Sequence, residues 1–588
     1  MNKKIYILLS FVALVTSGCK KELLDTVPYD QLSSATMWTT DNLTDLGVNS
    51  IYNALRLGQN TGSASGLEPY QYDRFGVTGQ TRDAGGDAML LGTITPGNGL
   101  FSSNWTNYYE GIIRAIDAIA NIPTKSPSTV VKKARLIAES KFLRAYFYFK
   151  LNEMWRGVPI YLEPIKYTEA VKPRSTEAEV WAVILKDLSD CIAEVNVPNK
   201  YAKGNSNFGR ITKGAAYALR GKTYLLMQKW AEAAADFANV KTAGYAIFPD
   251  YNTLFKESNE QNDEMIFSIQ NTGINGLGST TQFFCGTRSS FGSCWNTYLV
   301  SPKVVDLFEN TDGSKFSWDG IIPGFSTMTP QARQIYFMRD NLTPTELTAR
   351  SKLGADVTKY LATGNETRLM KAYTNRDPRL NSSVIIPYTS YNGIIGTSAA
   401  PVYSRFPFRS DVSGGDLRTD TQAEFYYLHR KFVYEGTTEL LNRSFGPIDF
   451  PLIRYADVLL MWAEALNEIG DVAGALSKVN EVRARVKMPA LQQTDATKPT
   501  HVISQTAARD RIRNERRYEF INEGVNYFDE IRWRTWKTSV FTNNGLQSVW
   551  GQRNTTYTWG GDHFYVWPIP QSEIQINNKL TQNPGWPN

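Results

Sequence analysis

Apolar side chains recur at intervals of three and four residues over several long segments of the chain. In one segment, Ala134, Ala138, Phe142, Ala145 and Phe149 follow this spacing. This spacing places the apolar side chains on one face of an α-helix, because one helical turn takes about 3.6 residues. The segments predicted to be helical are 38–57, 104–121, 128–155, 177–195, 213–241, 452–486 and 507–523.

The pattern changes between residues 244 and 446. This region is rich in Gly, Ser and aromatic residues and contains few long periodic runs. Gly and Ser favour turns, and aromatic residues favour strands. We therefore predict loops and short strands there.

Two of the predicted helical segments contain helix pairs with the same internal spacing. The matching positions are Tyr217, Gly221, Tyr224, Ala233 and Phe237 in the first pair and Leu459, Ala463, Leu466, Ala475 and Val479 in the second. The spacing is typical of the tetratricopeptide repeat, in which small residues let two helices approach closely. The predicted fold is therefore mainly α: a tetratricopeptide-like helical scaffold with a large loop-rich, short-strand insertion.

The first residues have the organisation of an export signal. Two lysines precede an apolar run at 5–15, and three small residues, 16–18, lead to Cys19. The run is shorter than the roughly 20 apolar residues of a transmembrane helix. Its end resembles the lipobox of bacterial lipoproteins, although Thr16 stands where the usual lipobox carries Leu. The resemblance implies cleavage after residue 18 and lipid attachment to the sulfur of Cys19.

Charge and histidine content narrow the classes of function. The 588 residues carry a net charge of +6, with no basic run of five or more residues, so we expect no nucleic-acid partner. His429, His501 and His563 are far apart in the chain, and no metal site is predicted. We predict no catalytic residue and no cofactor, although a glycosidase carboxylate pair would leave no local signature.

Three cysteines follow Cys19 in the chain. Cys191 falls within a helical pattern and is expected to be a small core residue. Cys285 and Cys294 are compatible either with a disulfide across a short loop or with two free thiols.

Aromatic residues make up 12% of the chain, and many of them stand in polar loop segments where no helical or strand period would bury them. A sugar-binding surface needs such rings, because a pyranose has a flat apolar face and polar hydroxyl groups at its edge. Aromatic residues in loops also anchor those loops to the core. Both interpretations remain open from composition alone.

Five segments, in order, carry a family resemblance. They are SKFLRAYFYFKLNEMWRGVPI at 140–160, NRDPRL at 375–380, PLIRYADVLLMWAEALNEIGD at 451–471, IRNERRYEFINEGVNYFDEIRW at 512–533 and YVWPIPQSEIQINNKLTQNPGW at 565–586. Together, and behind a lipobox-like cysteine, they closely resemble the SusD/RagB family of outer-membrane nutrient-binding lipoproteins. The resemblance spans nearly the whole mature chain.

The resemblance implies a lipid-anchored protein of the cell outer membrane, facing the exterior. Such a protein captures an oligosaccharide or polysaccharide and passes it to a SusC-like TonB-dependent transporter, over which it sits as a hinged lid. The alternatives are a surface glycan-degrading enzyme, a peptide- or glycoprotein-binding lipoprotein of the same fold, and an interaction scaffold that uses the helical groove.

The resemblance also implies where ligand contacts lie: in the loop after the first helix and in the irregular middle region. The corresponding residues are Tyr70, Tyr72, Arg74, Phe75, Arg82 and Asp83 in the first loop and Phe283, Phe284, Arg288, Phe291, Trp295 and Tyr298 in the second. We expect the chain to divide into a signal peptide (1–18), an anchor and tether (19–35), an N-terminal helical part (36–243), an insertion (244–446) and C-terminal helices with an extended tail (447–588).

Overall fold

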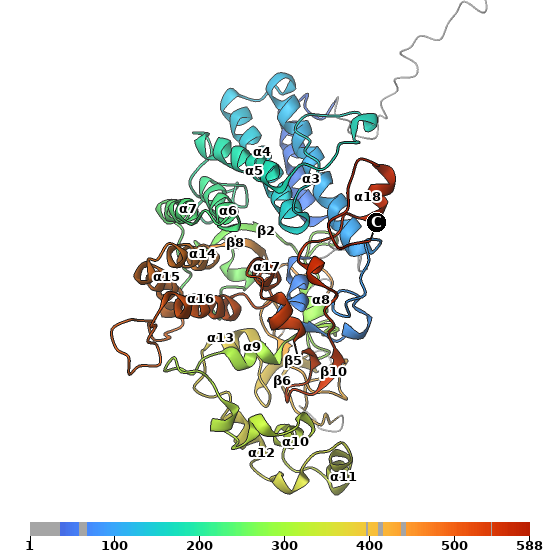
Figure 1. The fold of residues 1–588 in the computed structure, drawn as a ribbon, viewed down its shortest axis with the longest axis vertical. Helices are drawn as coiled ribbons and strands as arrows, with labels where there is room; N and C mark the ends of the chain where they lie inside the picture. Colours follow the sequence, from blue (N-terminus) through green and yellow to red (C-terminus); the bar gives the residue numbers. More distant parts are fainter. Residues whose placement is uncertain are drawn as a thin grey trace, which may run out of the picture.

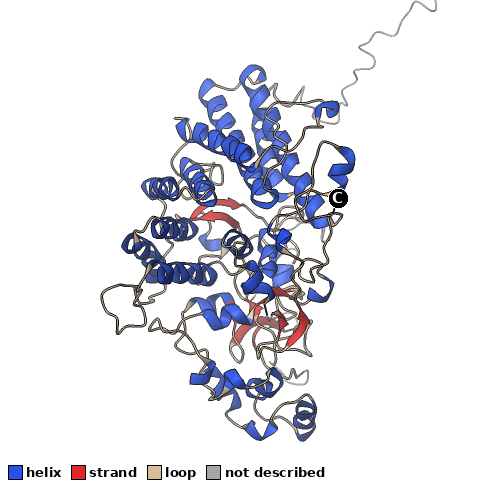
Figure 2. Cartoon of the chain, viewed as in Figure 1, coloured by secondary structure: helices blue, strands red, loops and turns tan. Residues whose placement is uncertain are grey.

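The computed structural model describes residues 36–57, 68–395, 398–409, 415–436, 443–542 and 544–587. The predicted signal peptide, the lipidation site Cys19 and the tether lie outside these residues. Within the described part, helices predominate and strands are short (Figure 2). This confirms the prediction of a mainly α fold. No helix in this part of the chain is long and apolar enough to cross a membrane.

The long helices form a layered array along one side of the molecule (Figure 1). They are α2 (Asp41–Asn53), α3 (Gly99–Lys125), α4 (Val130–Trp155), α5 (Glu177–Ala193), α6 (Lys213–Leu226), α7 (Trp230–Thr242), α14 (Tyr455–Glu468), α15 (Val472–Arg485) and α16 (Gln505–Glu519). Helices α3 to α7 pack in chain order, and α14 packs on α7. The two predicted helix pairs are thus neighbours in space, and the chain between them leaves the array and returns to it.

Local sequence accounts for where several of these helices begin and how closely they pack. The hydroxyl oxygens of Thr129, Thr176 and Thr212 each accept a hydrogen bond from a backbone N–H in the first turn of α4, α5 and α6. At Gly221 an added Cβ would lie 2.6 Å from a ring carbon of Phe237. Glycine at this position is therefore what allows α6 and α7 to pack together.

Several predicted helix boundaries differ from the structure, and two of these differences have a clear structural cause. The segment predicted to start a helix at 452 begins instead with strand β8 (Phe450–Arg454), which pairs antiparallel with β2 (Met265–Ile269). Helix α16 ends at Glu519 and not at 523. The chain turns after Phe520, and Gly524 has a φ of +69°, a conformation that no α-helix continues.

Short elements make up the rest of the described chain. The helices are α8 (Thr281–Cys285), α9 (Pro302–Leu307), α10 (Pro330–Arg333), α11 (Pro344–Lys352), α12 (Asn365–Met370), α13 (Arg379–Ser383), α17 (Asn526–Arg532) and α18 (Gln571–Ile576). The remaining strands pair antiparallel as β1 (Gly79–Thr81) with β3 (Tyr298–Val300), β4 (Val384–Ile385) with β7 (Leu428–His429), β5 (Ser390–Ile395) with β6 (Ser398–Tyr403), and β9 (Gly545–Gln547) with β10 (Arg553–Thr556).

Buried ion pairs join the insertion to the helical array. Glu519, at the end of α16, accepts hydrogen bonds from Arg454 at 2.7 Å and from Arg379 of the insertion at 3.0 Å. Arg485 is a third partner of the same carboxylate. Burial opposes the ionisation of Glu519, yet these three guanidinium groups hold its pKa well below the ordinary value. Arg379, the second arginine of the NRDPRL segment, is therefore a buried structural link and not a surface group.

Candidate functional site

The two loops predicted to bind ligand lie next to each other in the structure. Strand β1 of the first loop pairs with β3 of the second, so that Thr81 stands opposite Tyr298. One residue further on, the backbone N–H of Arg82 donates to the carbonyl oxygen of Thr297 at 3.0 Å. The Arg82 guanidinium donates to the carbonyl oxygen of Trp295 at 2.8 Å. The site is thus assembled by contacts between segments about 200 residues apart in the chain.

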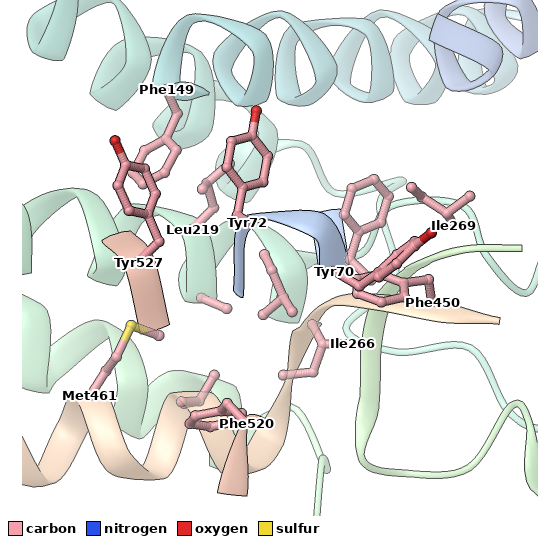
Figure 3. Packing of buried hydrophobic residues seen from close by; sticks show 14 of the residues in the cluster. Tyr70, Tyr72, Phe149, Leu219, Ile266, Ile269, Phe450, Met461, Phe520 and Tyr527 are labelled. Carbon is pink, nitrogen blue, oxygen red and sulfur yellow. The ribbon is translucent and has the colours of Figure 1, made fainter. Parts of the chain in front are cut away.

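Three aromatic side chains of the first loop lie in the core. Tyr70, Tyr72 and Phe75 belong to a 3-10 segment, Pro69–Phe75, and all three are buried. The hydroxyl of Tyr72 donates to Asn104 at 2.9 Å. The ring centroid of Tyr72 lies 6.1 Å from that of Tyr527, among the buried side chains that Figure 3 shows. Burial leaves these three rings no face for a surface ligand, so they anchor the loop in this structure.

Arg74 also serves the framework of the loop. Its Nε atom donates to Asp87 at 3.0 Å, and both side chains are mostly buried. The guanidinium carbon lies 4.3 Å from the ring centroid of Phe75 and 5.7 Å from that of Tyr298. Arg74 thus joins Asp87 of the first loop to the ring of Tyr298 in the second.

The second loop contributes a partly exposed aromatic group, which we call the aromatic shelf: Phe283, Phe284 and Trp295. Its ring centroids are 4.6 Å apart for Phe283 and Trp295 and 5.0 Å apart for Phe283 and Phe284. Trp295 is 38% exposed, Phe284 is partly buried and Phe283 is buried. Tyr298 packs behind the shelf, 6.0 Å from Phe284. The exposed indole is the one large apolar surface that the shelf offers to solvent.

Charged residues border the shelf. Asp420 accepts hydrogen bonds from Arg82 Nη1 at 2.5 Å and from Arg288 Nε. Partial burial opposes the ionisation of Asp420, but these two hydrogen bonds lower its pKa. Asp83 lies 3.5 Å from Arg82 Nε and is mostly exposed. Arg443 lies over the Phe283 ring, 4.8 Å from its centroid. Sequence reasoning missed Asp420 and Arg443, because each stands in a loop without any motif.

The two cysteines of this region are separate free thiols in the structure. The thiol of Cys285 contacts Asn522 Oδ1 at 3.6 Å, whereas that of Cys294 donates to the carbonyl oxygen of Phe291 at 3.3 Å. Burial raises the pKa of Cys294 to about 12. Both thiols therefore act as small buried side chains beneath the shelf.

A cavity of about 100 Å³ lies elsewhere, between α4, α6 and the Pro69–Phe75 segment. Its walls include Tyr72, Lys150, Glu153 and Lys222, and Lys150 donates to Glu153 at 2.5 Å. One water needs roughly 10–15 Å³ of cavity volume. The cavity therefore has room for a few waters and not for an oligosaccharide.

Carboxylates that could suggest catalysis or metal binding have other partners. Glu515 pairs with Arg379 at 2.6 Å and with Arg483 at 3.0 Å, and Glu519 lies in the ion-pair network described above. Within the described ranges, no group of three or more His, Cys, Asp or Glu residues is arranged to hold a metal ion. Around the shelf, one exposed ring has hydrogen-bonding groups at its edge.

Comparison with protein families accounts for most of the chain. Residues 260–586 match the profile of the SusD family. The chain belongs to the SusD family. Residues 24–225 match a second SusD-like profile, described as starch-binding and associating with the outer membrane.

Individual SusD-like proteins are similar to this chain over most of its length. SusD-like protein P38 of Formosa agariphila is 21% identical over 99% of both chains. The starch-binding protein SusD of Bacteroides thetaiotaomicron is 24% identical over 78% of this chain and 74% of its own. The crystal structure of a SusD-like carbohydrate binding protein of Bacteroides fragilis, 23% identical, superposes with a TM-score of 0.71 over 93% of this chain and 100% of its own. The fold is therefore the SusD-like fold.

Proposed function

We propose that this SusD-family chain binds an oligosaccharide or polysaccharide on the aromatic shelf and delivers it to a TonB-dependent outer-membrane transporter. The observation that carries the proposal is the exposed ring of Trp295 with Arg82 and Asp83 at its edge. The apolar face of a pyranose packs on the indole. The hydroxyl groups of the sugar exchange hydrogen bonds with the guanidinium and the carboxylate.

The described relatives support a glycan as the ligand. Among them are a protein named for starch binding and a solved structure described as carbohydrate binding. A peptide or glycoprotein cargo would also suit an open shelf with charged groups. The aromatic shelf favours the glycan, because a flat ring matches the flat face of a sugar.

The protein acts as the lid of its transporter in this proposal. Lipid on Cys19 anchors the chain to the outer membrane, facing the exterior, and the tether at 19–35 lets the lid swing without being lost. Neither the anchor nor the tether is among the described residues, so the sequence alone supports this part. Opening and closing as a hinged body is the functional motion.

The proposal is for binding without turnover. A surface glycan hydrolase would need two carboxyl groups about 5–10 Å apart across a cleft, with one of them protonated at neutral pH. Near the shelf, the structure places Asp420 in ion pairs with two arginines, which keeps it ionised. This environment does not suit a general acid.

The test is a binding screen of the purified full-length chain, in detergent, against a panel of glycans, followed by chromatography of each bound glycan. We expect saturable binding to at least one glycan whose length is unchanged after incubation. Shortened products would instead favour the enzyme, and binding of peptides alone would favour the peptide cargo. Co-purification of a TonB-dependent transporter with the lipidated chain tests the lid.

A further inference from the structure

Three arginines from three separate segments converge on one short turn, 291–296, which carries the exposed Trp295. We call Arg82, Arg288 and Arg443 the arginine rim. Arg82 Nη1 donates to the carbonyl oxygen of Trp295 at 2.8 Å, and Arg288 Nη1 donates to that of Ser293 at 3.2 Å. Arg443 Nη1 donates to the same Ser293 oxygen at 2.7 Å. The backbone of the turn thus holds the three cationic groups beside the shelf.

Each guanidinium of the rim keeps donor groups that the described protein does not use. Arg82 and Arg288 bond through Nη1 and Nε, and Arg443 bonds through Nη1 to the carbonyl oxygens of Gly292 and Ser293. None of the three Nη2 groups donates to a described residue. The side chains of Arg82 and Arg288 are 21% and 30% exposed. The residues that the structure describes therefore leave donors of all three arginines unused, and the side chains of Arg82 and Arg288 reach solvent beside the shelf.

In the part of the chain that the structure describes, the rim carries more positive than negative charge. Within the described ranges, the carboxylates that pair with its three guanidinium groups are Asp420, shared by Arg82 and Arg288, and Asp83. Arg443 has no carboxylate partner among them and instead lies over the Phe283 ring. Among the described residues, two carboxylates thus face three cations at the edge of the shelf.

From this arrangement we propose that the shelf selects glycans that carry anionic groups, carboxylate or sulfate, and that the arginine rim binds those groups. The inference rests on the proposed glycan-binding function and adds its substrate class. A guanidinium presents parallel N–H donors that match two oxygens of a carboxylate or sulfate, and a charged acceptor makes such bonds shorter and stronger. A neutral sugar gains the ring contact with Trp295 but leaves the excess charge of the rim unmatched.

The test uses pairs of glycans that share a backbone and differ in charge: polygalacturonate against its methyl ester, and sulfated against unsulfated dextran and galactan. Affinities of the purified full-length chain are measured by titration calorimetry at low and moderate salt. We expect at least one charged member to bind about tenfold or more tightly than its neutral counterpart. Its affinity should fall as salt rises, because salt screens charge attraction.

Variants separate recognition by the rim from general attraction to a basic protein. Arg443→Gln and Arg288→Gln should each lower the affinity for the charged glycan about tenfold and change the affinity for the neutral one little. Lys186→Gln removes one exposed charge from α5, away from the shelf, and should change the affinity for neither glycan. Arg443→Lys keeps the charge but not the paired donors, and should recover only part of the affinity.

The outcomes distinguish the selection of anionic glycans from glycan binding itself. Equal or tighter binding of the neutral members, or an equal loss in Lys186→Gln, overturns selection by the rim and leaves glycan binding standing. Equal losses for charged and neutral glycans in the arginine variants mean that these residues only shape the turn, which also overturns it. Absence of binding to every glycan of both kinds, and to every glycan of the panel described above, overturns the proposed function together with the inference.

Discussion

The backbone carbonyl of Trp295 accepts a hydrogen bond from the guanidinium of Arg82, 213 residues earlier in the chain. The donor comes from the loop that follows β1, and the acceptor belongs to the turn that presents the exposed indole. The same guanidinium also pairs with Asp420. The orientation of the candidate binding surface thus depends on contacts among three distant segments.

Removing the exposed ring tests the shelf directly. We expect Trp295→Ala to weaken glycan binding about tenfold or more, since it removes the main apolar surface on which a sugar can pack. Leu353→Ala is the matched control, because Leu353 is 57% exposed and lies in the insertion after α11. Titration calorimetry measures both. Equal affinities of the two variants would place the ligand elsewhere.

Gly524 tests the contact between the C-terminal helices and the first loop. Its φ is +69°, and an added Cβ would lie 1.8 Å from the carbonyl oxygen of Pro69. Gly470 also has a positive φ, but nothing lies within 4 Å of the corresponding Cβ. We expect Gly470→Ala to cost about 1–2 kcal/mol of folding free energy, from backbone strain alone. Gly524→Ala should cost clearly more, because the backbone must also move.

Denaturant unfolding of the two glycine variants measures this difference. Similar midpoints for Gly470→Ala and Gly524→Ala would show that the loop at Pro69 moves aside without cost. In that case the first loop would not be held by the turn after α16.

The buried carboxylate of Glu519 provides a test of the ion-pair network. Glu519→Gln leaves Arg379, Arg454 and Arg485 short of one negative charge in a buried site. We expect a loss of about 3–5 kcal/mol in the free energy of unfolding. Glu232→Gln, at an exposed position of α7, is the control and should change stability by less than about 0.5 kcal/mol. A small effect of Glu519→Gln would mean that the network is not needed to hold the insertion on the array.

His429 predicts a pH dependence of stability. Burial, reinforced by the nearby Lys431 cation, lowers the pKa of His429 to about 3. The folded state therefore holds the imidazole neutral, while the unfolded chain takes up a proton below its pKa of about 6.5. This contribution to stability is complete above pH 6.5 and is lost as the pH falls toward 3.

Between pH 7.5 and pH 5 the loss attributable to His429 should be about 2 kcal/mol. The measurement is the change in unfolding free energy between these two pH values for the wild type and for His429→Gln. Other titrating groups contribute to both proteins, so the difference between the two changes isolates the histidine. Identical pH slopes would contradict the assignment.

Helix positions were predictable from the sequence, because the spacing of apolar residues repeats with the period of a helix over many turns. The ring-to-glycine contact of Phe237 and Gly221 within one helix pair was likewise encoded by local spacing. Helix ends were less predictable. Residues 452–454 form part of a strand because β2, from the insertion, is the hydrogen-bonding partner of that strand. No neighbouring residue in the sequence reveals that partner.

The candidate site shows more clearly what the sequence alone could not predict. The sequence singled out Tyr70, Tyr72 and Trp295 alike, as aromatic residues in polar loops. Only the tertiary structure places the two tyrosines in the core and leaves Trp295 exposed. The physical reason is that burial depends on what packs over a ring. Here that covering comes from strands, helices and charged partners hundreds of residues away, whose approach no local pattern specifies.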